Sequence, residues 1–381
     1  MKNSGSNIRN VAVVGAGASG LLTARLLSEN PDIHVSVFEK RRQIANKLRA
    51  SGGGRANIFN ENVRPEDYNN QVFIEKLLKN VSPGDLKEQF LKLGLLTMAD
   101  DENRVYPITQ VAQTVVDVIS DFENDNVSLY TESPIQCVEY VDGKWTVDGH
   151  KQKFDALVLS TGSPANAVQA QQIGYNGYLQ SLGLKTRRFQ PSLVGFVLSS
   201  YPKRLSGCRT KAIVSLYQDN RLIHKEKGEV IFKDDGVSGI VVMNASSFYR
   251  RLQNHNNCRI EFNLTYWDEH FQVKDYLRRY GSLQGLLHPK LSEFYNTEPF
   301  DIQHFSFGIL DTYPIESAQV CSGGVDLSEI NDDFSVKKYR NLYVTGEMLD
   351  IDGLCGGYNL FFAFASAMVV ARSLSKKLNC E

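Results

Sequence analysis

The stretch NVAVVGAGASGLLTARLLSE, residues 10–29, decides the fold of this chain. Its β-branched run, Val11 to Val14, favours a buried strand, and a leucine-rich helical pattern begins after Gly20. Between strand and helix, Gly15, Gly17 and Gly20 complete a G-x-G-x-x-G turn. The first glycine allows the tight turn, the second lets a pyrophosphate approach the backbone, and the third lets the helix pack on the strand. The amide end of that helix favours phosphate.

A second strand, HVSVFEK, follows the helix and ends at Glu39. A carboxylate at this position accepts the hydroxyls of an adenosine ribose and disfavours a 2′-phosphate. A lone G-x-G-x-x-G often marks only a turn, but strand, glycines, helix, strand and acid together predict a dinucleotide-binding Rossmann unit. At this point NAD and FAD both remain open.

Two later segments favour FAD. DALVLSTGS, residues 155–163, and RNLYVTGEMLDIDGLCGGYN, residues 340–359, each read as a strand that runs into a glycine turn. Such turns suit an extended ligand that lies over the carboxyl edge of a sheet. The last helix opens near Gly357 and Tyr358, so its amide end would face an electron-rich group such as a flavin carbonyl oxygen.

The segment SGGGRANIFN, residues 51–60, is the least common feature of the chain. Three consecutive glycines before Arg55 are compatible with a phosphate-binding loop, a hinge or a flexible turn. Because the segment follows the second strand, we expect it at the same sheet edge as the first glycine turn. We interpret it as a rigid anion-binding loop with bare backbone against the cofactor, where Arg55 and Asn57 supply side-chain donors.

The motifs VVGAGASG, KLRASGGGRANIFN, NRVYPIT, GEVIF…GVSG and GEMLDIDGLCGGYN resemble the signature set of the BaiN/RdsA-type NAD(P)/FAD-dependent oxidoreductases. These are aminoacetone-oxidase-like flavoproteins related in layout to glutathione reductase. The resemblance runs from about Val11 to Ala371. It implies bound FAD, and proposed activities in the family include aminoacetone oxidation and reduction of unsaturated bile-acid ketones. Ala56, Ile240 and Phe361 depart from the family's pattern, which leaves the substrate preference in doubt.

The resemblance also implies an α/β architecture with a Rossmann-like FAD domain, an inserted β-rich, barrel-like domain and a small helical domain. We expect these at residues 1–188 and 326–381, at 189–267 and 306–325, and at 268–305. Three alternating stretches within residues 127–154 read as a meander beside the sheet.

Motifs and resemblance together predict one set of cofactor-binding residues. These are Gly15, Gly17, Ala18, Ser19, Gly20, Glu39, Lys40, Lys47, Ser51, Gly53, Gly54, Arg55, Asn57, Thr161, Gly162, Gly346, Glu347, Asp350, Gly356, Gly357, Tyr358 and Asn359. The catalytic acid or base stays unknown, because no spacing singles out Tyr106, His288 or His304. Cys355 has no C-x-x-C partner, so we interpret it as a packing residue.

The composition of the chain limits the classes of partner that we expect. Lys+Arg 42 against Asp+Glu 43 leaves a net charge of -1, from which we expect no nucleic-acid partner. The 6 cysteines and 7 histidines form no metal-ligand motif, so we expect no metal and a cytoplasmic location. The apolar run Leu360 to Ala371 is too short to span a bilayer, which indicates a buried helix and no membrane partner. Oligomeric state stays open.

These observations predict an FAD-dependent oxidoreductase acting on a small organic substrate. It would be either a reductase that uses NAD(P)H as co-substrate or an amine or ketone oxidase. The alternative is a flavin-binding sensor or a tRNA-modification-type flavoprotein without small-molecule turnover. A basic stripe on the folded surface would favour that alternative.

Overall fold

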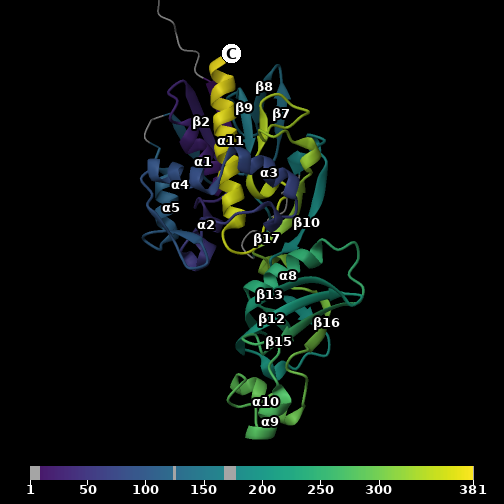
Figure 1. Ribbon diagram of the computed structural model, residues 1–381. Coiled ribbons are helices and arrows are strands. Elements are labelled where there is room, and N and C mark those ends of the chain that lie inside the picture. Colours follow the sequence, from purple (N-terminus) through teal and green to yellow (C-terminus); the bar gives the residue numbers. More distant parts are fainter. Residues whose placement is uncertain (1–8, 123–125, 167–176, 381) are drawn as a thin grey trace, which may run out of the picture. The chain divides into compact units, whose positions relative to one another are not determined.

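The computed structural model describes residues 9–122, 126–166 and 177–380. The chain divides into two compact units (Figure 1). Unit 1 comprises Met1–Pro164, Gln172–Phe189 and Gly323–Glu381, and unit 2 comprises Ala165–Gln171 and Gln190–Ser322. The chain passes between them along the two-stranded sheet of β10 (Thr186–Ser192) and β17 (Val320–Val325).

Unit 1 is built on a five-stranded parallel sheet in the order β18-β9-β1-β2-β6. In the central strand, Val11 pairs with both Val35 and Ala156. The strands β9 and β18 are apolar and buried along their whole length, as expected of a parallel sheet covered on both faces. The bounds are β1 Arg9–Val14, β2 Ile33–Phe38, β6 Val127–Tyr130, β9 Ala156–Leu159 and β18 Leu342–Val344.

Strand β6 corrects the expected meander. Val127 pairs in parallel with Val35, so this segment extends the sheet, and only β7 (Val138–Val141) and β8 (Lys144–Val147) form a hairpin. Alternating hydrophobicity is the same in a parallel edge strand and in a meander strand, and only the long-range pairing separates them.

Two helices form the core beside the sheet. The first, α1 (Ala18–Leu27), packs against α11 (Tyr358–Cys380), whose Phe361, Phe364 and Leu374 are fully buried. By length and composition α11 could cross a bilayer, and it is the one such helix in the described ranges. However, 67% of its apolar window is buried inside the protein, which is the burial of a core helix.

The remaining elements of unit 1 are short helices and a second, small sheet. Helix α4 begins with a capping box, in which the Ser82 hydroxyl accepts from Asp85 N at 3.1 Å and the Asp85 carboxylate accepts from Ser82 N at 2.8 Å. A small antiparallel sheet has the order β3-β5-β4. The bounds are α2 Asn46–Ala50, β3 Phe59–Asn60, α3 Gln71–Asn80, α4 Pro83–Lys92, β4 Thr97–Ala99, β5 Arg104–Pro107, α5 Ala112–Ser120 and α7 Gly177–Ser181.

Unit 2 is a closed antiparallel barrel in the order β11-β14-β13-β12-β15-β16. Asp219 and Asn220 make the β12–β13 turn with φ of 48° and 64°, a conformation that Asp and Asn tolerate. The bounds are β11 Phe196–Leu198, β12 Arg209–Gln218, β13 Arg221–Phe232, β14 Gly236–Ser238, β15 Cys258–Asn263 and β16 Phe305–Thr312.

Three helices accompany the barrel: α8 (Ile240–Arg250), α9 (Val273–Tyr280) and α10 (Pro289–Thr297). Sequence analysis missed α8, because the run that contains it is almost continuously apolar at its start and has no strong cap. The segment expected as a separate helical domain shares the barrel's hydrophobic core through Leu287, Leu291 and Phe294.

Candidate functional site

The first glycine turn has two glycines that the protein itself requires and one that it does not. A Cβ at Gly15 would lie 2.5 Å from Ser160 O, and one at Gly20 would collide with Gly15 O. At Gly17 a Cβ would meet no atom within 4 Å. The bare backbone at Gly17 therefore leaves room for a ligand at the amide end of α1, as a bound diphosphate needs.

Glu39 lies beside that turn. Its Oε2 accepts from Ala16 N at 3.0 Å and its Oε1 accepts from Arg41 N at 3.1 Å. The carboxylate is thus held at the carboxyl end of β2, where an adenosine ribose is expected. For the neighbouring Lys40, burial and then the Arg41 charge lower the ammonium pKa, against an opposing effect of Glu39.

Residues from three distant segments meet at the same sheet edge. Lys47 Nζ forms an ion pair with Glu347 Oε2, and Ser163 Oγ donates to the same oxygen at 3.0 Å. The residues Thr161 and Met348 are joined here as well, since the Thr161 amide and hydroxyl each lie 3.2 Å from the Met348 sulfur. Sequence analysis missed Ser163 and Met348, although each adjoins a predicted residue.

Gly346 connects the last segment to the first turn. Its φ is 62°, and a Cβ there would lie 2.8 Å from Ser19 Oγ, so no larger residue fits. Its amide donates to Ser366 Oγ on α11 at 3.1 Å. Three predicted residues, Ser19, Gly346 and Glu347, therefore share one edge of the sheet.

The backbone conformation of the triple-glycine loop requires glycine. Gly52, Gly53 and Gly54 have φ of 57°, 66° and 85°, which other residues rarely adopt. Side chains added at Gly53 or Gly54 would meet nothing within 4 Å, so these exposed positions leave the backbone open to a ligand. Ser51, which opens the loop, donates its hydroxyl to Leu48 O at 2.7 Å.

Arg55 is exposed at the end of this loop. Its Nε donates to Gly52 O at 3.3 Å, and its guanidinium carbon lies 5.0 Å from the centre of the Tyr106 ring. These contacts orient the guanidinium without neutralising it, so the charge stays available to an anion.

Asn57 joins the triple-glycine loop to the start of α11. In the amide orientation that its neighbours require, its nitrogen donates to Phe59 O at 3.1 Å and its oxygen accepts from Gly357 N at 3.2 Å. A Cβ at Gly357 would lie 2.5 Å from Phe59 C, so the close approach needs glycine. The protein itself uses the Asn57 amide that the sequence had suggested as a cofactor donor.

Further contacts close the same junction. Asn60 Nδ2 donates to Gly356 O at 3.3 Å, and Asn359 exchanges two hydrogen bonds of 2.9 Å with the Gly353 backbone. Tyr68 donates to Tyr358 O at 2.7 Å, and its complete burial raises the pKa of its hydroxyl well above the ordinary value. Sequence analysis did not identify Asn60 or Tyr68.

Asp350 contacts residues of β10 and β17, the two strands that connect to unit 2. Its Oδ1 accepts from Gly323 N at 2.9 Å, and its Oδ2 pairs with Arg187 Nε at 3.1 Å. Burial raises the pKa of this carboxyl, although Gly323 and Arg187 act to lower it. As a cofactor ligand, Asp350 stays a prediction.

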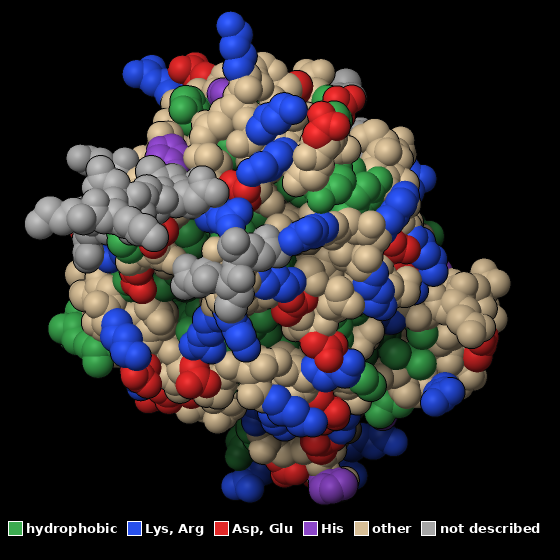
Figure 2. Space-filling model, turned by 90° about the horizontal axis from the view of Figure 1, so that it is seen from above, with side chains coloured by type: hydrophobic (Ala, Val, Ile, Leu, Met, Phe, Trp, Pro, Cys, Tyr) green, Lys and Arg blue, Asp and Glu red, His purple; other side chains and the backbone are tan. Residues whose placement is uncertain are grey.

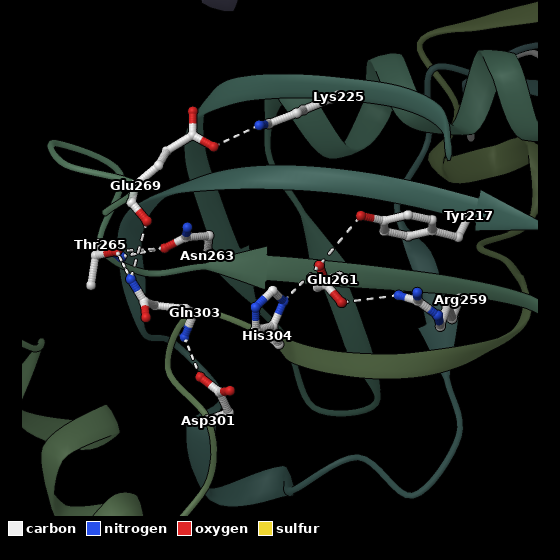
Figure 3. Close-up of polar contacts among 10 residues, drawn as sticks. All are labelled: Tyr217, Lys225, Arg259, Glu261, Asn263, Thr265, Glu269, Asp301, Gln303 and His304. Carbon is white, nitrogen blue, oxygen red and sulfur yellow. Dashed lines mark hydrogen bonds and ion pairs between the residues drawn. The ribbon is translucent and has the colours of Figure 1, made fainter. Parts of the chain in front are cut away.

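The structure does not single out a catalytic acid or base. His288 caps α10 by accepting from Lys290 N at 3.2 Å, and His304 Nδ1 lies 3.3 Å from Glu261 Oε1 on the barrel (Figure 3). Both histidines thus have structural partners. In the described part of the chain, no group of three His, Cys, Asp or Glu side chains could hold a metal ion.

The donor set at the sheet edge fits a dinucleotide with an electron-rich ring. Backbone amides at Gly17 and at the triple-glycine loop suit phosphate oxygens, and the amide end of α11 suits a ring carbonyl oxygen. The acceptor at Glu39 suits ribose hydroxyls. These residues fit FAD.

Comparisons with known proteins agree with that fit. The model of a family described as HI0933-like protein Rossmann domain matches residues 9–373. The chain is 26% identical over 407 residues to a 3-dehydro-bile acid delta(4,6)-reductase of Clostridium scindens, covering 96% of this chain and 99% of that protein. It is 24% identical over 400 residues to a ribosomal RNA dihydrouridine synthase of Haemophilus influenzae, covering 96% and 98% respectively.

The fold also has a counterpart among solved structures. The 3-ketosteroid delta1-dehydrogenase of Sterolibacterium denitrificans aligns with a TM-score of 0.51 at 11% identity, over 97% of this chain and 100% of that chain. This likeness concerns the fold alone.

Proposed function

The chain belongs to the HI0933-like family of FAD-dependent oxidoreductases, and from this premise we propose that it reduces a carbon–carbon double bond conjugated with a carbonyl group, with NAD(P)H as electron donor. The names of two relatives describe this one bond change. A bile acid with a ketone beside ring double bonds is reduced in the first, and dihydrouridine is a uridine whose carbonyl-conjugated ring double bond is saturated.

The reaction balances with one nicotinamide. The carbon remote from the carbonyl gains a hydride, the adjacent carbon gains a proton from a protein group or water, and NAD(P)H leaves as NAD(P)+. Bound FAD supplies the two-electron relay between donor and acceptor. The chain's own residues bind and orient it through the bare backbone at Gly17, Gly53 and Gly54, the Glu39 carboxylate and the amide end of α11.

One observation carries the proposal in the structure: the Asn57 amide joins the triple-glycine loop to Gly357 at the start of α11. This contact fixes the triple-glycine loop against the amide end of α11 at one place on the sheet edge. Amides preorganised in this way stabilise negative charge that develops on a bound ring during two-electron reduction. A site built only for a diphosphate would not need this second group of donors.

The test is an anaerobic reduction of the purified yellow protein with NADH and with NADPH, followed through the flavin absorbance. We expect reduction by one nicotinamide, rapid re-oxidation by an unsaturated ketone and slow re-oxidation by air. An amine or saturated ketone that reduces the flavin where both nicotinamides fail would make the protein an oxidase. A flavin that responds to no donor would favour the sensor, and a colourless protein without FAD would exclude all of these functions.

A further inference from the structure

Unit 1 exposes a group of large apolar side chains outside the cofactor site. They are centred on the small sheet β3-β5-β4, where Leu96, Met98 and Ile108 are 56%, 47% and 57% exposed. Leu91 near the end of α4 and Val111 after β5 flank them and are 56% and 47% exposed. We call these five residues the apolar patch. Single exposed apolar residues are ordinary, but a group of this kind indicates a surface that a partner covers.

The small sheet has one face against the core and one face towards solvent. Val105 on β5 is fully buried, and Ala99 beside it packs against the same core. Leu96 and Met98 alternate with Ala99 along the strand, so they lie on the opposite face. On that face Tyr106, which pairs with Met98, is buried against the triple-glycine loop. The apolar patch therefore lies next to this loop, on the face of the sheet that the described residues leave exposed.

The outer edge of β4 offers backbone groups for pairing. β4 is the last strand in the order β3-β5-β4. Ile108 N donates to Leu96 O at 2.9 Å, so Leu96, and with it Met98 two residues on, directs its backbone groups at β5. Since backbone groups alternate in direction along a strand, the amides and carbonyls of Thr97 and Ala99 point to the outer edge. An edge strand that also carries exposed apolar side chains is a template for pairing with another chain.

We propose that the apolar patch and the outer edge of β4 join two copies of this chain about a twofold axis at Met98. Antiparallel pairing about this axis sets Thr97 of each copy opposite Ala99 of the other, which uses every outward amide and carbonyl of β4. The two Met98 side chains then face each other, and Leu96 of each copy lies diagonally within reach. One surface serves both copies, as a twofold interface requires.

The charges around the apolar patch are complementary under the same axis. Lys92 precedes β4 and Asp101 follows it, so antiparallel pairing brings Asp101 of one copy towards the Lys92 segment of the other. Asp101 is exposed, and no ion pair is recorded for it in the described part of the chain. Lys92 pairs with Glu88 through side chains that are 64% and 63% exposed, a pair that contributes little by itself. A second copy thus supplies a partner for each of these charges.

The same charges make a polyanion a poor partner for the apolar patch. Over residues 88–104, four Asp and Glu residues stand against two Lys and Arg residues. A local acidic excess repels nucleic acids and anionic lipids. On the face drawn in Figure 2, Lys and Arg side chains are interspersed with Asp and Glu among the described residues, without a basic stripe. A second copy of the chain fits the apolar patch better than a polyanion does.

The first experiment measures the mass of the FAD-loaded protein by sedimentation velocity over a range of concentrations. We expect a particle of twice the chain's mass that dissociates on dilution. Met98→Asp should raise the dissociation constant of the dimer at least about hundredfold, because it sets two carboxylates against each other at the axis. Val72→Asp, at a 65% exposed apolar residue of α3 outside the apolar patch, is the matched control and should dimerise as the wild type does.

Ala99→Pro tests the backbone pairing separately from the side chains. Proline removes the outward amide of residue 99, whereas the bonds between β4 and β5 come from the neighbouring positions and remain. We expect the dissociation constant to rise at least about tenfold, because the amide is lost on both copies. Unchanged far-UV circular dichroism and FAD content would show that the variant folds.

Cross-linking tests the position of the axis. The exposed Cys137 is first replaced by serine in every protein compared. Oxidised glutathione should then convert Met98→Cys to a covalent dimer, because the Cα atoms of a non-hydrogen-bonded pair lie about 4.5 Å apart, within the range of a disulfide. Leu96→Cys is the matched control from the same patch, since the axis sets its two copies about 14 Å apart.

The outcomes decide the inference without reference to the reaction. A monomer at every concentration, or a dimer that survives both Met98→Asp and Ala99→Pro, overturns it. Cross-linking of Leu96→Cys in place of Met98→Cys overturns the twofold axis at Met98. Binding to RNA or to anionic lipid vesicles that Met98→Asp abolishes would assign the apolar patch to another partner and overturn the inference as well. Flavin reduction by a nicotinamide tests the proposed function separately in the same preparations.

Discussion

Glycines of one motif are required for different reasons. Some are required because protein atoms lie too close for a side chain, and others leave room for a ligand. Gly20 lies against Gly15 O, whereas the space next to Gly17 is open, although both belong to the same motif. The spacing of the motif predicted both positions. It could not tell them apart, because that distinction depends on which atoms of distant segments, such as Ser160, lie opposite each Cα.

Gly17→Ala should therefore leave the free energy of unfolding of the cofactor-free protein within about 0.5 kcal/mol of wild type. It should weaken FAD binding at least about tenfold, because a methyl group would occupy the place of the diphosphate. Gly20→Ala is the contrasting variant, and we expect it to destabilise the cofactor-free protein by more than about 2 kcal/mol. Urea unfolding and FAD titration measure the two effects; an unchanged FAD affinity in Gly17→Ala would contradict the diphosphate site.

Arg55 offers a second test with little structural cost. Its recorded contacts are with its own loop and with the Tyr106 ring, so Arg55→Ala should change stability by less than about 0.5 kcal/mol. Loss of one charge-assisted hydrogen bond should weaken FAD binding about tenfold or more. Arg42→Ala, at an exposed cation in the preceding loop, controls for general charge effects. Equal affinities in all three proteins would refute contact between Arg55 and the pyrophosphate.

Among the structural elements, α11 begins at a point that long-range contacts hold in place. Asn57→Ala should cost about 1 to 3 kcal/mol of stability, because it leaves Phe59 O and Gly357 N without their partner. It should also lower the reduction potential of bound FAD, since the helix amides are no longer held beside it. Asn70→Ala, which removes the N-cap of α3, should lose about 1 kcal/mol with no change in potential. If both variants shift the potential equally, Asn57 has only a structural role.

The free energy of unfolding should depend on pH through Asp326, which directly follows β17. Backbone and side-chain hydrogen bonds from Ser328, followed by Arg187 and Lys185, hold the pKa of Asp326 below its ordinary value. A depressed carboxyl pKa stabilises the fold above the unfolded-state pKa of about 3.9, and this stabilisation is lost as the pH falls through the folded pKa. Asp326→Asn should therefore be less stable than wild type at pH 7, and the difference should shrink below about pH 4. Urea unfolding across this range would contradict the prediction if the difference stayed constant.

Whether a segment forms a helix or a strand was easier to predict than which other segment it pairs with. Local sequence patterns predicted the strands β1, β2, β9 and β18 and the helices α1 and α11, because each is a local pattern of burial. They misassigned β6 and missed α8. In β6 the pairing partner Val35 is about ninety residues away, and in α8 the apolar run Ile240–Met243 reads equally well as strand or helix.

At the scale of the whole molecule, the buried apolar side chains of the described residues form two hydrophobic cores, one in each unit. We expect two unfolding transitions in calorimetry, of which only that of unit 1 rises with added FAD, because a ligand stabilises the cooperative unit that binds it. Hydrogen exchange should locate the protection by FAD at the amides of residues 15–20, 51–55 and 356–358. A single transition that rises as a whole with FAD would show that the two units unfold together.

The chemistry of the cofactor could be predicted without coordinates. Glycine spacing, an acid at the end of a strand and a late glycine pair are local constraints, and each depends on backbone geometry that neighbouring residues impose. The assembly of the site depends on contacts between remote segments. Lys47 meets Glu347 across 300 positions, Asn57 binds the amide of Gly357, and Gln303 holds the loop of Trp267. Such contacts form only when packing brings distant segments together. No local sequence pattern specifies which polar group of one segment will bind which group of another.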